Sequence, residues 1–201
     1  TTGENEILIA SKEGKCIRFV EEDVRPTGRG TQGVKAITLS KNDIVVDMLI
    51  IDPTFDLFTL TSLGYGKRSN VEDYRLQSRG GKGIKGMSVN EDDIIDQFLT
   101  MSTHEDLLMF TNKGKVYRIR GYRVPMASRT AKGIPVVNLL NLDKDEKVKA
   151  MVRVNHTENI ANEYLFFVTK DGLVKRTAMT EFEVSYNSAA QVTCTNDYRR
   201  A

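Results

Sequence analysis

The chain has 201 residues, of which 40% are hydrophobic and 28% charged, a composition that is ordinary for a globular protein. Its formal net charge of +2 is too small to indicate nucleic-acid binding by itself, so such an inference depends on where the charges lie. No run approaches the roughly 20 apolar residues that span a bilayer, no signal peptide is visible, and the two cysteines, Cys16 and Cys194, fit a reducing compartment. We therefore expect no membrane contact, a cytoplasmic location and no disulfide framework.

A pattern of about fifty residues recurs along the chain. Gly-x-x-x-Arg occurs four times, at intervals of 50, 50 and 58 residues: Gly14/Arg18, Gly64/Arg68, Gly114/Arg118 and Gly172/Arg176. Downstream of the first three glycines, Arg-x-x-x-Gly-(Val/Ile) begins at Arg29, Arg79 and Arg129, and an acidic turn follows each of these loops. Because these features recur in phase, the chain is interpreted as a series of structural repeats.

Each repeat has the signals of β-strands taken in the same order. Short apolar runs rich in strand formers open the repeats at residues 6–10, 57–61, 107–111 and 164–169. A glycine turn and a second strand follow, as at residues 115–119, which predicts a hairpin. A third strand is expected after the arginine loop, as at 133–139, and a fourth after the acidic turn, as at 94–99. Four strands per repeat predict an all-β, propeller-like fold, with blades at about 6–52, 55–101 and 104–153 and a divergent or partial blade at 163–201.

The segment 77–83, Gln-Ser-Arg-Gly-Gly-Lys-Gly, contains three glycines and two cations between two apolar segments. Glycine permits positive φ and a close approach of other backbone, so such a loop can turn its N–H groups outward as an anion-binding concavity. Arg79 and Lys82 add positive charge at the same place. This combination suits a phosphate chain, although a tight, charged β-turn explains the same residues.

This segment, with 64–68 and 73–75 before it, resembles the signature box of the C-terminal domain of DNA gyrase A. Other segments resemble the same family, and the similarity covers about residues 6–182: 17–19, 23–26, 102–104, 112–117, 128–138 and 172–177. The intact RGGKG favours gyrase over the related topoisomerase IV, in which the box is degraded. In the family the box blade usually opens a domain with more blades, whereas here another repeat precedes it, which indicates a shortened, rearranged or permuted member.

The resemblance implies that residues 1–201 form one β-pinwheel domain, a ring of blades in which neighbours exchange a strand. In that family the rim is basic and double-stranded DNA wraps around it, so that strand passage by the parent enzyme introduces negative supercoils. The implied partners are DNA, the rest of gyrase A and gyrase B. Because cleavage and ATP hydrolysis lie elsewhere in that enzyme, the domain is expected to be non-catalytic and to need no cofactor.

The candidate DNA contacts are the cations that recur in phase, since a wrapped duplex must be held at its phosphates without reading of bases. One per blade lies on the second strand: Arg18, Arg68, Arg118 and Arg176. The others lie on or near the arginine loops or beside these strand residues: Arg29, Lys35, Lys67, Arg79, Lys82, Lys85, Arg129 and Lys132. The remaining box residues complete the candidate site: Gln77, Gly80, Gly81 and Gly83.

Several alternatives stay open. Each repeating arginine can instead pair with a carboxylate of a neighbouring blade, and the tyrosines can pack across strands rather than stack on sugars. A propeller that serves as a protein-interaction module is a different functional class, although the chain has no Trp for the Trp-Asp signature of its commonest form. The few His and Cys residues lack metal-ligand spacing and no GxxxxGK[ST] motif occurs, so no metal and no ATP site are expected.

Overall fold

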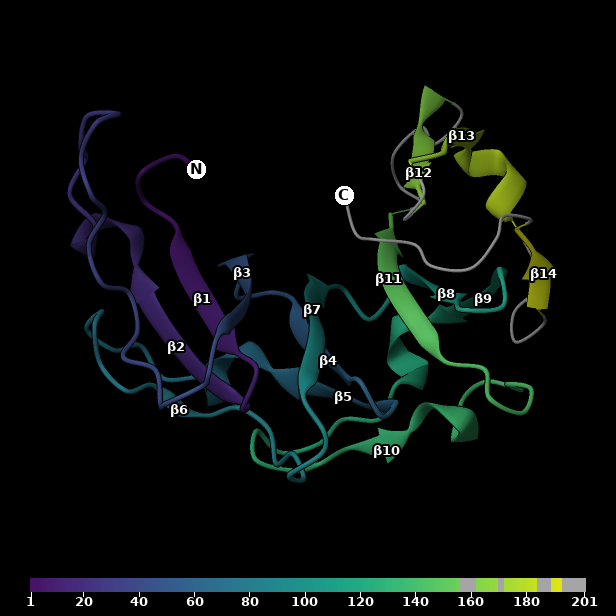
Figure 1. Cartoon of the computed structure of the whole chain (residues 1–201), viewed down its shortest axis with the longest axis horizontal. Coiled ribbons are helices and arrows are strands. Elements are labelled where there is room, and N and C mark those ends of the chain that lie inside the picture. The colour runs from purple at the N-terminus through teal and green to yellow at the C-terminus, as the bar shows by residue number, and fades with distance from the viewer. Residues whose placement is uncertain (156–161, 170–171, 184–188, 193–201) are drawn as a thin grey trace. The chain divides into compact units, whose positions relative to one another are not determined.

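The computed structural model describes residues 1–155, 162–169, 172–183 and 189–192 (Figure 1), and these form an all-β structure, as the sequence predicts. The strands are β1 (Glu6–Ser11), β2 (Lys15–Val20), β3 (Val45–Ile51), β4 (Asp56–Thr61), β5 (Tyr65–Asn70), β6 (Ile84–Lys85), β7 (Ile95–Met101), β8 (Asp106–Thr111), β9 (Lys115–Arg120), β10 (Ile134–Pro135), β11 (Val148–Val154), β12 (Tyr164–Val168), β13 (Val174–Ala178) and β14 (Ala189–Gln191). Short 3-10 turns occupy Glu21–Asp23, Val71–Asp73, Gly121–Arg123, Val136–Asn138 and Met179–Phe182.

The predicted glycine hairpin opens every repeat. β1 pairs antiparallel with β2, β4 with β5, β8 with β9, and β12 with β13. The hairpin glycines have φ between 67° and 82°, a range that other residues rarely adopt: Gly14, Gly64, Gly114 and Gly172. In the first three repeats the fourth strand returns to the other side of the first strand, so β1, β4 and β8 are central strands.

In the second, third and fourth repeats, the third strand does not join the sheet of its own repeat. β6 pairs with β2 of the first repeat, β10 lies beside β5 of the second, and β14 pairs with β9 of the third. The described residues thus form three four-stranded sheets, β3-β1-β2-β6, β7-β4-β5-β10 and β11-β8-β9-β14, and a two-stranded sheet of β12 and β13. This exchange is the β-pinwheel topology that the resemblance implies.

The predicted length of the exchanged strand in the third repeat is wrong. A strand was expected over 133–139, but β10 contains only Ile134 and Pro135, and a 3-10 turn begins at Val136. Pro135 has no N–H to donate to a neighbouring strand, so a long ladder cannot run through it. The segment from Gly33 to Leu39, its counterpart in the first repeat, contains no strand.

The chain divides into two compact units. Unit 1 contains residues 1–102 and 125–134, and unit 2 contains residues 103–124 and 135–201. The excursion of residues 125–134 into unit 1 is the exchanged arm of the third repeat, which ends beside β5. That the whole chain acts as one domain remains a prediction.

Apolar side chains between the first two sheets form the core of unit 1. Leu8 and Cys16 of the first sheet pack with Leu57 and Phe98 of the second, and Met87, just after β6, lies in the same cluster. In unit 2, Phe110 of β8 lies edge-to-face with Phe167 and Phe182 of the fourth repeat, at ring-centroid distances of 5.4 and 5.9 Å. The hairpin of the first repeat is covered on both faces, because Ile7 and Phe19 on the opposite face pack with Ile37.

The acidic turns fasten the fourth strands to the hairpin turns. Asp43 accepts a hydrogen bond from the N–H of Glu13, and Asp93 accepts from the N–H of Leu63, both at 3.0 Å. Glu146 accepts from the hydroxyl of Thr111 at 2.6 Å. All three residues are buried, so these three carboxylates are used within the fold and do not lie at the surface.

In the described part of the chain, no helix has the length and apolar character needed to cross a bilayer.

Candidate nucleic-acid interface

The box loop, residues 77–83, is held against the first repeat by backbone hydrogen bonds. The N–H of Gln77 donates to the carbonyl of Arg18 at 2.8 Å, and the N–H of Gly80 donates to the carbonyl of Ala36 at 2.6 Å. Thr38 completes the contact, because its N–H donates to Gly81 and its hydroxyl donates to Gly80. The loop is therefore a fixed surface feature of unit 1 and lies beside residues 35–38.

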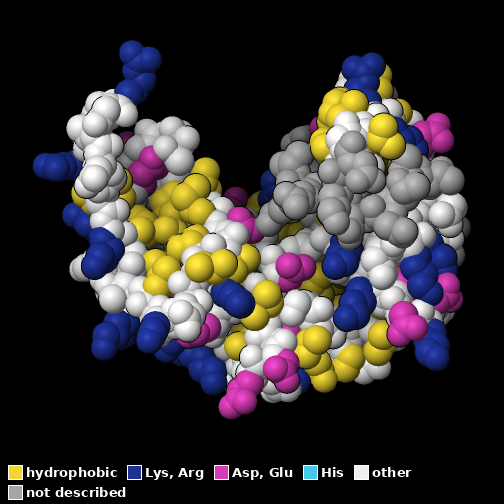
Figure 2. Space-filling view, in the orientation of Figure 1, with side chains coloured by type: hydrophobic (Ala, Val, Ile, Leu, Met, Phe, Trp, Pro, Cys, Tyr) yellow, Lys and Arg dark blue, Asp and Glu magenta, His cyan; other side chains and the backbone are white. Residues whose placement is uncertain are grey.

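Cations cluster on this loop and on its equivalents in the first and third repeats. The side chains of Arg29, Lys35, Lys82 and Lys85 are exposed, whereas Arg79, Arg129 and Lys132 are half-buried. All seven belong to unit 1, since the third loop lies within residues 125–134. Figure 2 shows Lys and Arg side chains along the outer edge of this unit, beside β2 and β6.

The two half-buried loop arginines donate to backbone carbonyls. Arg79 donates from Nε to Asp23 at 2.7 Å and from Nη1 to Lys35 at 3.1 Å. Arg129 donates from Nη1 to the carbonyl of Lys85, which is the same contact one repeat later. Lys132 places its ammonium 3.7 Å from the centroid of the Tyr65 ring, a cation–π contact.

The strand arginines form ion pairs within the protein. Arg18 pairs with Glu6 at 2.5 Å, Arg68 with Asp56 at 2.6 Å and Arg118 with Asp106 at 2.5 Å. Their side chains are only 7%, 14% and 13% exposed, respectively. The alternative left open for this series, pairing with a carboxylate, is what the structure shows, except that the main partner comes from the same repeat.

A regular spacing in the sequence indicates this pairing. The three carboxylates Glu6, Asp56 and Asp106 each lie twelve residues before the arginine and recur with the same period of fifty. The hairpin register places Glu6 opposite Val20, so the side chain two residues earlier, Arg18, lies diagonally across the strand pair.

Arg18 also connects the first blade to the second. Its Nη1 donates to the carbonyls of Val71 and Tyr74, at 3.0 and 3.2 Å, and its Nη2 lies 3.3 Å from the carboxylate of Glu72.

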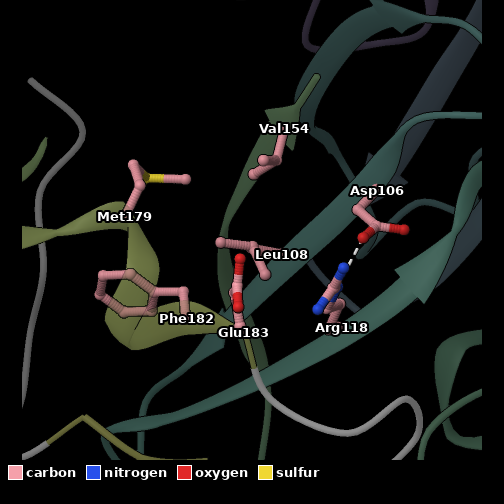
Figure 3. A pocket seen from close by; sticks show the side chains of 7 residues that line it. All are labelled: Asp106, Leu108, Arg118, Val154, Met179, Phe182 and Glu183. Atoms are coloured by element: carbon pink, nitrogen blue, oxygen red, sulfur yellow. Dashed lines mark hydrogen bonds and ion pairs between the residues drawn. The ribbon is translucent and has the colours of Figure 1, made fainter. Parts of the chain in front are cut away.

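In unit 2, the pair of Asp106 and Arg118 lines a small pocket opposite the 3-10 turn of the fourth repeat (Figure 3). These arginines are therefore structural, and we leave Arg18, Arg68 and Arg118 out of the contact set proposed below.

Arg176 differs from the other strand arginines. Tyr164 takes the place of the carboxylate twelve residues earlier, and the guanidinium of Arg176 lies 4.5 Å from the centroid of its ring. Arg176 is exposed, which leaves it available to a ligand at the surface of unit 2.

Lys67 is fully buried and donates from Nζ to the carbonyl of Gly86 at 3.0 Å, to that of Ser128 at 3.1 Å and to that of Arg129. Burial lowers the pKa of Lys67 to about 8. Its ammonium thus holds the exchanged arms of two repeats together and is not at the surface, so we remove it from the contact set as well.

The other box residues differ in burial, hydrogen bonding and backbone conformation. The side-chain amide nitrogen of Gln77 is buried without a hydrogen-bond partner. Gly80 and Gly83 have φ of 83° and 66°, respectively, which the loop conformation requires, whereas Gly81 is exposed. Among the described residues, no group of three His, Cys, Asp or Glu side chains is arranged to hold a metal ion.

Comparison with known proteins identifies relatives over parts of the chain. DNA gyrase A of Escherichia coli is 42% identical over 71 residues, which is 35% of this chain and 8% of that protein. DNA gyrase A of Mycoplasma pneumoniae is 53% identical over 51 residues, 25% of this chain and 6% of that protein. These matches thus span less than a tenth of the length of the relatives.

Solved structures show the same fold over nearly the whole chain. A DNA gyrase A C-terminal domain superposes with a TM-score of 0.76 at 23% identity, covering 98% of this chain and 64% of that domain. The C-terminal domain of a DNA topoisomerase IV has a TM-score of 0.74 at 19% identity, covering 92% of this chain and 55% of the other. The family described as the DNA gyrase C-terminal domain, beta-propeller, matches residues 5–52, 56–99, 105–155 and 163–193, so the chain belongs to this family.

Proposed function

We propose that the chain binds double-stranded DNA without sequence preference, through the cations of its exchange loops, and bends the duplex along them. The observation that carries the proposal is the recurrence of cations at equivalent loop positions in unit 1. Lys35 and Lys85 are fifty residues apart and both exposed. Lys82 and Lys132 are also fifty residues apart, the first exposed and the second half-buried.

Such an arrangement matches the chemistry of a DNA backbone. Phosphates are recognised by fixed cations irrespective of sequence, whereas base reading needs side chains aimed into a groove. Bending a stiff duplex costs on the order of several kcal/mol, so several phosphate contacts must offset it. Each neutralised phosphate contributes about −0.9 to the slope of log affinity against log salt.

Family membership supports a proposed role in a parent enzyme. We propose that the chain is a non-catalytic part of a cytoplasmic DNA gyrase, which would act on the bacterial nucleoid together with the rest of gyrase A and with gyrase B. There the bent duplex would be presented for strand passage, and negative supercoils would result. The loop cations Arg29, Arg79, Arg129 and Lys132 belong to the proposed contact surface of unit 1 together with the exposed lysines, and Arg176 is a separate proposed contact on unit 2.

A salt titration tests DNA binding. Fluorescence anisotropy of two labelled duplexes of unrelated sequence, each at several salt concentrations, should give equal affinities that fall steeply with salt. The triple variant Lys35→Ala, Lys82→Ala, Lys85→Ala should reduce the magnitude of the slope by about 2.7, because three phosphate contacts are lost. The matched control removes three exposed lysines from the acidic turns: Lys41→Ala, Lys144→Ala and Lys147→Ala.

Equal losses in the triple variant and in its control would assign the binding to net charge rather than to the loops. An absence of binding at low salt would instead favour the protein-interaction module. Bending is read separately, from the linking difference of relaxed circles that ligase closes in the presence of the protein. Arg79→Ala with Lys82→Ala should reduce that difference more than it weakens simple binding, and an unchanged linking difference would defeat the wrapping proposal.

A further inference from the structure

We infer that Arg79 and Arg129 are positioning residues, which hold the backbone of Lys35 and Lys85 so that these two lysines contact the phosphates. The inference rests on the DNA binding proposed above and assigns separate roles within that surface. It replaces the simpler reading in which every loop cation contacts DNA directly.

The contact recurs one repeat apart. Arg79 Nη1 donates to the carbonyl of Lys35, and Arg129 Nη1 donates to the carbonyl of Lys85, so donor and acceptor both shift by fifty residues. A second contact repeats in the same way, because the hydroxyl of Thr38 donates to Gly80 and that of Ser88 donates to Thr130, each at 2.7 Å. Each arginine loop is therefore held against the preceding arm by two hydrogen-bond contacts, which we call the clip.

The geometry of Arg79 argues against a side-on contact with a phosphate. Arginine binds an oxyanion most strongly with two parallel N–H groups, and the side-on pair includes the Nε–H. In Arg79 this N–H already donates to the carbonyl of Asp23 at 2.7 Å, and Nη1 donates to Lys35. Arg79 is also half-buried, whereas Lys35, Lys82 and Lys85 are exposed.

The two roles predict different responses to a conservative change. A lysine at position 79 keeps the charge but offers one ammonium nitrogen in place of the separate Nε–H and Nη1–H donors, so we expect it to lose the two fixed hydrogen bonds to Asp23 and Lys35. A direct phosphate contact would survive Arg79→Lys, whereas the clip would not. Arg75 is the control, because it is an exposed arginine close to the box loop and lies outside the proposed contact surface.

The first test measures duplex affinity and its salt slope for the whole chain. We expect Arg79→Lys to weaken binding about fivefold with the slope unchanged, and Lys35→Ala to weaken it similarly with a slope smaller by about 0.9. The double variant should be no weaker than Lys35→Ala alone, because the clip acts through that lysine. Arg75→Lys should bind like the unaltered protein. Full affinity in Arg79→Lys, or additive losses in the double variant, would overturn the inference.

A second measurement does not depend on DNA. Hydrogen exchange at the amides of Gly80 and Thr38, which donate across the clip to Ala36 and Gly81, should be faster in Arg79→Lys and unchanged in Arg75→Lys. Unchanged exchange in Arg79→Lys would overturn the clip. Faster exchange in a protein that fails to bind DNA would establish the clip and overturn both the proposed function and the role of Lys35.

Discussion

The exchanged arms of the second and fourth repeats make the same strand pairing with very different residues. In the second repeat Ile84 and Lys85 pair with Cys16 and Lys15. In the fourth, Ala190 and Gln191 pair with Val116 and Lys115 in the same register. Gly83 and Ala189 are thus equivalent, and so are Lys85 and Gln191.

The comparison distinguishes the residues that strand exchange requires from those that it does not require. An arm of Ala and Gln completes the sheet of β8, β9 and β11, so neither the lysine nor the glycine-rich loop is required for strand exchange. The strand arginines differ in a parallel way, because Arg118 is paired with a buried carboxylate and Arg176 lies over Tyr164 at the surface. The charges of the second repeat therefore call for an explanation other than folding.

The largest expected effect concerns the carboxylate that the fourth repeat lacks. Asp106 is fully buried and lies 2.5 Å from Arg118 and 3.1 Å from Arg120. Asp106→Ala should lower the free energy of unfolding by about 3–5 kcal/mol, because it leaves a largely buried guanidinium unpaired. Urea denaturation followed by circular dichroism measures the loss.

The control for this prediction is the exposed carboxylate that contacts Arg18. Glu72 lies 3.3 Å from Arg18 and is 65% exposed, so Glu72→Ala should cost less than about 1 kcal/mol. Equal losses in the two variants would show that burial does not decide the strength of these pairs.

The next effect tests why the second arm has a glycine where the fourth has Ala189. Gly83 has a φ of 66°, and an added Cβ would lie 2.6 Å from the carbonyl oxygen of Cys16. Gly83→Ala should therefore cost about 2–4 kcal/mol of stability, from backbone strain and the displaced arm. Gly33→Ala is the equivalent change in the first repeat, where no atom lies within 4 Å, and it should be nearly neutral. A neutral Gly83→Ala would contradict the strain expected at this position.

A pH effect is expected from Lys67, which has no counterpart at the equivalent positions Ile17 and Tyr117. Because the pKa of Lys67 is lowered to about 8 in the folded chain, the unfolded chain binds more protons between pH 8 and the ordinary lysine value, and stability rises with pH there. The rise between pH 8 and 10 should be about 2 kcal/mol.

The measurement is the difference between the unaltered protein and Lys67→Met across this range. The difference is needed because burial raises the pKa of both Cys16 and Tyr74 nearby, and these groups lower stability as pH rises. A pH-independent difference between the two proteins would contradict a lowered pKa for Lys67.

The smallest effect copies the fourth arm into the second. Lys85→Gln reproduces Gln191, so we expect stability to change by less than about 0.5 kcal/mol, as for other surface substitutions. Duplex affinity should fall severalfold and the salt slope by about 0.9. A large loss of stability would show that Lys85 serves the fold, and would remove the contrast between the two arms.

Local features of this chain could be predicted from the sequence. The hairpins at Glu6–Val20 and Asp106–Arg120, their glycine turns and the period of fifty residues depend on residues that are close in sequence, so alternation and turn chemistry reveal them. The recurring loop cations could also be located in this way, because the repeat places them in phase.

The tertiary structure alone decided which of these cations reach the surface. Arg18, Lys67 and Lys85 look alike as charges spaced along a repeat. The hairpin register pairs Arg18 with Glu6, and contact with the second repeat adds the carbonyls of Val71 and Tyr74. The exchanged strands place Lys67 against three carbonyls and leave Lys85 in solvent. The contacts that bury the first two join segments as far as 62 residues apart, and spacing along the chain does not specify such contacts. The sequence by itself therefore determined the repeat and its charges, whereas strand exchange between repeats determined which charges remain for a ligand.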